Sequence, residues 1–182
     1  MTDAEARVRE LFPEVEEIKD RALADKVIAL WLKSWQGSDW ADLTEVPKND
    51  RMSEVSLVEH VRGVTRAARA IAQTAIDMYD NIDIDMDLLT AGALLHDMSK
   101  PLEGNKDGKT RMGYYFPHGY LAAQMAQTEG LPNELVHIIL THSRNTAPML
   151  PKTYEALIVH YADYCDSDIL NIRYDKKILL KF

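Results

Sequence analysis

The chain has 182 residues, of which 46% are hydrophobic, and its formal net charge is −8. This length and composition are typical of one globular domain with a sizeable core and argue against two domains. The acidic charge disfavours a broad nucleic-acid interface, which needs a basic face, although a deep site could still attract one anionic substrate.

The sequence leads us to expect neither a membrane span, nor a signal peptide, nor a disulfide framework. No apolar run approaches the roughly 18 residues that a membrane span requires, and residues 1–5 are acidic, unlike a signal peptide. A single cysteine, Cys165, excludes an internal disulfide framework and fits a reducing compartment. We therefore expect a cytoplasmic protein that has no membrane partner.

Residues 1–52 are expected to form a helical extension that packs on the rest of the chain. Apolar residues recur at spacings of three and four within residues 3–20, and a stronger helix is predicted over residues 23–35, ending near Gly37. Three tryptophans fall in this region, and core packing is favoured over a wall that stacks a ligand: Trp31, Trp35 and Trp40. The segment 37–49 is predicted to be a loop, to which the sequence assigns no chemistry.

A long core helix follows, for which Ser53 is the expected N-cap. Apolar residues continue at spacings of three and four from Leu57 to Ala75, and His60 lies beside that face. Taken alone, such a histidine is more typical of a core residue bound to a backbone carbonyl than of a metal ligand. The acidic run 77–87 lacks the glycine and the terminal glutamate of a calcium loop, so a solvated turn that caps the next helix is expected.

The most informative segment is the apolar helix over residues 88–95, which runs directly into His96 and Asp97. Burying an unpartnered carboxylate costs several kcal/mol, and the usual remedies are a salt bridge or a metal ion. Histidine and aspartate are both common ligands of first-row metals. Adjacent helical residues point about 100° apart, so the two side chains could flank one cluster, and Asp97 could bridge two ions.

Three more segments carry a histidine or an aspartate in a comparable setting. His118 opens a helix, His142 closes one, and Asp163 shares a face with the apolar residues of the last strong helix. With His60 and His96, each candidate is separated from the next by about one helix and one connection. Each candidate is therefore expected on a different helical segment.

The ordered pattern H, HD, H, H, D resembles the HD-domain superfamily of metal-dependent phosphohydrolases, in the six-ligand variant that holds a dinuclear centre. The resemblance covers about residues 53–168 and leaves residues 169–182 as a C-terminal tail. It implies an all-α fold, a single-domain helical bundle with the metals among its central helices. Members often carry a lysine three residues after the aspartate, where this chain has Lys100.

The resemblance also implies how the ligands are shared between two divalent transition-metal ions. One ion would take His60, His96, Asp97 and Asp163. The other would take Asp97, His118 and His142. Iron is the first expectation for their identity, with manganese, cobalt, nickel and zinc as alternatives. Asp97 and Lys100 are the expected catalytic residues, because Lys100 could offset charge that grows on a phosphoryl group.

Candidate substrate contacts surround these ligands. Residues 101–116 contain three glycines and no apolar period, so they are expected to form a lid-like loop over the site. Lys100, Lys109 and Arg111 are candidate phosphate contacts, with a solvated loop as the alternative for the last two. Arg144 follows His142 closely and could reach an oxyanion, with a surface position as the alternative. His160 could support Asp163 or touch substrate, although the sequence does not favour either role.

Three functions are compatible with this pattern. A hydrolase that acts on a small phosphorylated metabolite or nucleotide comes first. The alternatives are a di-iron oxygenase of the same fold, which would cleave a C–C or C–P bond with dioxygen, and a non-catalytic regulatory domain, which would be expected to have lost ligands. The expected partner is a small phosphorylated molecule, and a homo-oligomer is possible.

Overall fold

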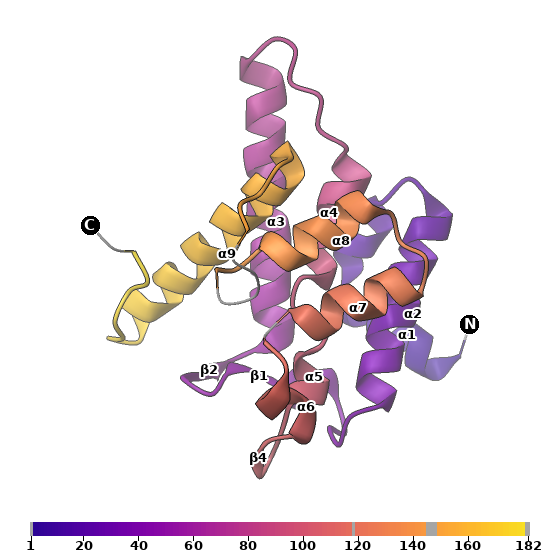
Figure 1. The fold of residues 1–182 in the computed structure, drawn as a ribbon, viewed down its shortest axis with the longest axis vertical. Helices are drawn as coiled ribbons and strands as arrows, with labels where there is room; N and C mark the ends of the chain where they lie inside the picture. The colour runs from indigo at the N-terminus through magenta and orange to yellow at the C-terminus, as the bar shows by residue number, and fades with distance from the viewer. Residues whose placement is uncertain (1, 118, 145–148, 181–182) are drawn as a thin grey trace.

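A computed structural model describes residues 2–117, 119–144 and 149–180 (Figure 1). Its α-helices are α1 (Asp3–Leu11), α2 (Arg21–Gln36), α3 (Leu57–Met78), α4 (Met86–Leu95), α5 (Lys100–Glu103), α6 (Arg111–Tyr115), α7 (Tyr120–Thr128), α8 (Asn133–Thr141) and α9 (Tyr154–Arg173). Two 3₁₀ turns, η1 (Pro13–Glu17) and η2 (Leu43–Glu45), and two small antiparallel hairpins complete the described fold. The hairpins are β1 (Pro47–Asn49) with β2 (Met52–Ser56), and β3 (Gly104–Asn105) with β4 (Gly108–Lys109). The predicted all-α fold is confirmed.

Helix α4 is the centre of the packing. It contacts α2, α3, α8 and α9, and every residue from Leu89 to Leu95 is buried. The long helices α3 and α9 pack against each other and against α4, while α7 and α8 form a pair beside them (Figure 1). This arrangement places the end of α4, where His96 and Asp97 follow, in the interior of the protein.

The N-terminal segment shares the main hydrophobic core. Phe12 stacks on Trp31 with ring centroids 4.4 Å apart, and Trp31 is fully buried, which confirms its predicted core role. Trp35 and Trp40 are partly buried against the same core. The proposed division of the chain at residues 52 and 168 stays a prediction, and α9 continues to Arg173 without a break at that second position.

Local capping explains where the helices begin. Helix α2 has Asp20 as N-cap and Gly37 as C-cap, close to the predicted end, and Asp85 caps α4 in the acidic turn. The expected N-cap at Ser53 is wrong, because α3 begins at Leu57, four residues after it. Ser56 caps α3 instead: its Oγ accepts the Glu59 N–H at 3.2 Å, and the Glu59 carboxylate accepts the Ser56 N–H at 2.9 Å. Of these two serines, only Ser56 has a glutamate three residues later, as a capping box requires.

The predicted lid, residues 101–116, contains short ordered elements rather than a continuous loop. Helix α5, the β3–β4 hairpin and α6 follow one another here, and α5 contacts both α2 and α6 (Figure 1). Beyond α9, the tail turns back on that helix, because the Asp168 carboxylate accepts hydrogen bonds from the backbone N–H groups of Leu179 and Leu180.

Within the described ranges, no helix has the length and hydropathy needed to cross a bilayer.

Close packing of α4 on α8 depends on Gly92. A Cβ atom at this position would lie 2.6 Å from Cγ2 of Ile138, which is too close for two carbon atoms. We expect Gly92→Ala to lower the free energy of unfolding by about 1–3 kcal/mol through overpacking. Chemical denaturation measures this change, with Gly104→Ala as the control. Its Cβ would meet its nearest neighbour at 3.6 Å, so it should stay within about 1 kcal/mol of wild type.

A Gly92→Ala protein as stable as the wild type would show that α8 can move away without cost.

Candidate metal centre

The turn after α4 is held in place by side chains of α2. The last carbonyl groups of a helix have no partner within that helix. Trp31 Nε1 donates to the Leu94 carbonyl at 2.9 Å, and Ser34 Oγ donates to the Met98 carbonyl at 2.5 Å. These buried bonds fix the backbone on both sides of His96 and Asp97.

Backbone carbonyls also fix the orientation of two histidine rings. His96 Nδ1 lies 2.6 Å from the Ala93 carbonyl oxygen, and His142 Nδ1 lies 2.6 Å from that of Ile139. A carbonyl can only accept, so in both rings Nδ1 carries a proton, and in the neutral imidazole Nε2 then keeps a lone pair. This tautomer is the one in which Nε2 can bind a metal.

The Nε2 atoms of three histidines converge on Asp97. Asp97 Oδ2 lies 3.4 Å from Nε2 of His60 and 3.4 Å from Nε2 of His96, and Oδ1 lies 3.7 Å from Nε2 of His142. Asp163 Oδ1 lies 3.2 Å from His60 Nε2. Neighbouring ligand atoms of one metal ion are expected to lie about 3.0–3.4 Å apart. Three of these four distances fall in that range, and the fourth is slightly longer.

Burial makes this cluster a good fit for a cation. His60, His96, Asp97 and His142 are each at most 1% exposed. The His96 Nε2 atom has no hydrogen-bond partner among the described residues, which is costly for a buried polar atom. Ligand atoms of His60, His96 and Asp97 all lie within 4.8 Å of one another. The arrangement therefore fits a divalent metal site, and the orphaned Nε2 is the observation that favours one most directly.

His60 is held by carboxylates on α9. Its Nδ1 lies 2.6 Å from Asp166 Oδ2 while its Nε2 faces Asp97 and Asp163. Burial alone would lower the pKa of His60, but the hydrogen bonds to Asp163, Asp166 and Asp97 outweigh it and raise the pKa to about 9. Burial likewise opposes ionisation of Asp163, yet the facing imidazoles hold its pKa well below the usual range. A metal that binds His60 at Nε2 must displace the proton on that nitrogen, while Nδ1 keeps its hydrogen bond to Asp166.

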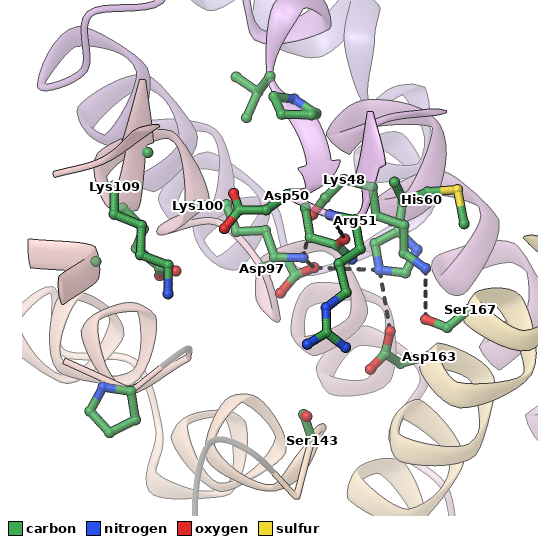
Figure 2. A pocket seen from close by; sticks show the side chains of 18 of the residues that line it. Lys48, Asp50, Arg51, His60, Asp97, Lys100, Lys109, Ser143, Asp163 and Ser167 are labelled. Atoms are coloured by element: carbon green, nitrogen blue, oxygen red, sulfur yellow. Dashed lines mark hydrogen bonds and ion pairs between the residues drawn. The ribbon is translucent and has the colours of Figure 1, made fainter. Parts of the chain in front are cut away.

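Lys100 forms an ion pair with the carboxylate of Asp97. Its Nζ lies 2.5 Å from Asp97 Oδ2 and donates to the carbonyl of Lys48 at 2.8 Å (Figure 2). The predicted spacing of three residues therefore places the ammonium directly at Asp97, because Lys100 begins the short helix that follows the turn.

A pocket of about 880 Å³ opens over these residues. His60, Asp97, Asp163 and Lys100 line it, whereas the buried His96 and His142 do not. Lys109, in β4, also lines the pocket, and Figure 2 shows its side chain at some distance from Asp97. The lid segment contributes three aromatic residues to the pocket wall: Tyr114, Tyr115 and Phe116. Trp40, from the N-terminal segment, also lines the pocket. The ligand-wall alternative for Trp40 therefore stays open.

The remaining predicted residues are placed as follows. His118 lies outside the described residues, so its role as a ligand stays a prediction. Arg111, Arg144 and His160 do not line the pocket. His160 Nδ1 instead lies 2.9 Å from the Thr141 carbonyl, and its ring stacks on Tyr164 at 4.8 Å. The substrate roles proposed for these three residues stay predictions.

Sequence reasoning missed polar residues of the site, among them Lys48, Arg51 and Asp166. Lys48 is 3% exposed, and its Nζ donates to Ser167 Oγ at 2.7 Å. Burial lowers the pKa of Lys48, and the carboxylates of Asp163 and Asp166 counteract it. The one available signal was for Asp166, which follows Asp163 by three residues and so lies on the same helical face.

Asp166 has room beside His60 because α3 carries a glycine one turn later. A Cβ at Gly63 would lie 2.6 Å from Asp166 Oδ1. By accepting the Nδ1 proton, Asp166 orients His60 and increases the basicity of its Nε2.

We expect Asp166→Ala to weaken metal binding by roughly 10–100-fold while the fold is retained. Competition with a chromogenic chelator measures the affinity, and circular dichroism checks the fold. Glu155→Gln, at the other end of α9, is the matched control and should bind metal as the wild type does. An unchanged metal affinity in Asp166→Ala would show that His60 needs no such support.

Residues 57–168, from the first residue of α3 to the last turns of α9, match the HD domain family model. With the His96–Asp97 pair at the centre of the helices that this match covers, the chain belongs to the HD-domain family.

Curated relatives extend the comparison. Dihydroneopterin 2′,3′-cyclic phosphate phosphodiesterase of Methanocaldococcus jannaschii is 31% identical over 170 residues, which cover 86% of this chain and 68% of that protein. 3′-5′ exoribonuclease YhaM of Bacillus subtilis is 28% identical over 146 residues, 71% of this chain and 44% of the exoribonuclease. Ribonuclease Y of Pseudothermotoga lettingae is 28% identical over 93 residues, or 16% of its length. No solved structure matches the chain significantly.

Proposed function

We propose that this protein is a metal-dependent phosphohydrolase that cleaves a phosphodiester in a small, nucleotide-like substrate. The observation that carries the proposal is the convergence of three imidazole Nε2 atoms and two carboxylates, with the Lys100 ammonium beside them, at a pocket. The pair of metals, with His118 as a ligand of the second, is part of the proposal.

The roles of the residues follow from their positions. His60, His96, Asp97 and Asp163 would hold one divalent ion, and Asp97, His118 and His142 the other. Ions held there would supply a nucleophilic hydroxide from water at neutral pH. Lys100 would turn from Asp97 toward the phosphoryl oxygens and offset the negative charge that grows on them. His96 and His142, whose Nδ1 protons are bound to carbonyls, hold fixed tautomers throughout.

The pocket supports a small anionic substrate. Its volume of about 880 Å³ lies in the usual range for small-molecule sites. Cations line it in a chain whose net charge is −8: Lys48, Arg51, Lys100, Lys109, Lys176 and Lys177. Aromatic residues of the lid offer faces on which a planar ring can stack.

The relatives support a diester in particular. One is named as a phosphodiesterase for a 2′,3′-cyclic phosphate and another as an exoribonuclease. Because the present chain is acidic overall, we propose a small phosphorylated molecule rather than a long nucleic acid as its substrate.

A substrate panel tests the proposal. Metal-loaded protein is assayed with 2′,3′-cyclic nucleotides, nucleoside monophosphates and a short oligoribonucleotide, in air and under argon. We expect hydrolysis of a cyclic diester at the same rate in both atmospheres. Release of phosphate from monophosphates alone would redirect the proposal to phosphomonoesters, and no hydrolysis of any member would contradict it.

The oxygenase alternative has no specific observation in its favour. The relatives reported above are named as a phosphodiesterase and ribonucleases, not as oxygenases. Turnover that depends on dioxygen would nevertheless restore it, and the argon arm of the panel provides that test.

A further inference from the structure

The β1–β2 hairpin brings two cations to the pocket that the family pattern does not include. Lys48 lies in β1, and Arg51 lies in the turn between the strands. Both line the pocket, and Figure 2 shows the Lys48 amine at Ser167, with Arg51, Lys100 and Asp97 at the same pocket. The hairpin is also tied to the centre, because Lys100 Nζ donates to the Lys48 carbonyl at 2.8 Å.

The Lys48 ammonium has fewer acceptors than it needs. An ammonium group has three N–H donors. Among the described residues, Nζ makes one hydrogen bond, to the hydroxyl of Ser167 at 2.7 Å, although the side chain is buried. The carboxylates of Asp163 and Asp166 attract the ammonium electrostatically and Lys100 repels it, but neither carboxylate accepts a hydrogen bond from Nζ. A buried cation in this situation is stabilised by an anion that supplies the remaining acceptors.

Arg51 shows the complementary feature, an anchored backbone with an unpaired side chain. Its N–H donates to Asn49 Oδ1 at 2.9 Å, and its carbonyl accepts Lys176 Nζ at 2.6 Å. Lys176 in turn pairs with Glu54 at 2.7 Å, which locks the hairpin to the segment after α9. The guanidinium itself makes no hydrogen bond or ion pair with any residue in the described ranges, so it stands at the pocket with its donors available.

We propose that the β1–β2 hairpin is a phosphate-recognition arm, in which Lys48 binds an oxygen of the substrate phosphoryl group inside the pocket and Arg51 binds a second oxygen nearer the mouth. The identity of the anion rests on the proposed function. The two contacts serve binding and orientation and leave the metal ligands unchanged.

Binding of inorganic phosphate to the metal-loaded protein tests the arm without turnover. Isothermal titration calorimetry on Lys48→Met should give a dissociation constant roughly 10–100-fold above that of the wild type, because a charge-assisted hydrogen bond is lost. Arg51→Met, at an exposed position, should weaken binding by about 3–10-fold. Lys33→Met removes a cation that pairs with Glu129 outside the pocket and should leave the affinity unchanged. Metal content is measured for every variant.

The outcomes separate the arm from the function. If Lys48→Met and Arg51→Met, both folded and metal-loaded, bind phosphate as the wild type does, the arm is wrong even where hydrolysis is found. If the variants weaken phosphate binding while no ester is hydrolysed, the arm stands and the proposed function fails. Should Lys48→Met lose its fold or its metal, Arg51→Met decides, and an unchanged phosphate affinity in that variant overturns the proposal.

Discussion

Asp97→Asn is expected to abolish metal binding and hydrolysis together. Among the described residues, Asp97 is the one side chain that faces His60, His96, His142 and Lys100, all at distances between 2.5 and 3.7 Å. An amide keeps the size of the carboxylate but removes the negative charge that balances a divalent ion. We expect a loss of at least about 1,000-fold in kcat, because the metal contributes several kcal/mol to the transition state.

The measurement combines metal content with initial rates on the best substrate of the panel. Asp83→Asn, in the solvated turn before α4, is the matched control and should keep both. Circular dichroism separates loss of the site from loss of the fold. An Asp97→Asn protein that retains stoichiometric metal and more than a tenth of the activity would remove Asp97 from the centre of the mechanism.

Lys100→Met is expected to lower kcat by about 100-fold with the metal content unchanged. Its ammonium lies 2.5 Å from Asp97 but belongs to no expected ligand set, so its loss removes positive charge from the reacting group rather than a ligand. Steady-state kinetics should show most of the effect in kcat, since the charge to be offset develops in the transition state.

Lys33→Met serves again as the control, with unchanged kcat. If Lys100→Met instead loses its metal, Lys100 acts mainly by holding Asp97 in position. If its activity on every phosphorylated substrate is unchanged, the catalytic role assigned to Lys100 is wrong.

The helical fold could be predicted because its signals are local. The apolar period of α3 and the uninterrupted apolar run of α4 indicate buried helices, and the match over residues 57–168 confirms the family that the pattern of His60, His96 and Asp97 resembles. These residues were identifiable because they lie on apolar helical faces or at buried helix ends, where a polar side chain is costly unless it has a partner.

The polar residues around the centre depend on contacts that no local pattern records. Asp166 reaches His60 only because α9 packs on α3 at Gly63, and residues 106 positions apart in sequence make that hydrogen bond. Lys48 lies in a segment with turn-like composition, and its importance comes from Ser167 and Lys100, which tertiary packing brings to it. The error at Ser53 has a local cause, since the glutamate that completes a capping box follows Ser56.

The most direct test of the account is hydrolysis of a 2′,3′-cyclic nucleotide by one preparation of the protein, before metal removal, after chelation and after reloading, with the metal content determined at each stage. The account predicts that activity falls with the metal to background and returns when the metal returns, while Asp97→Asn stays inactive throughout. Undiminished hydrolysis by metal-free protein would contradict it.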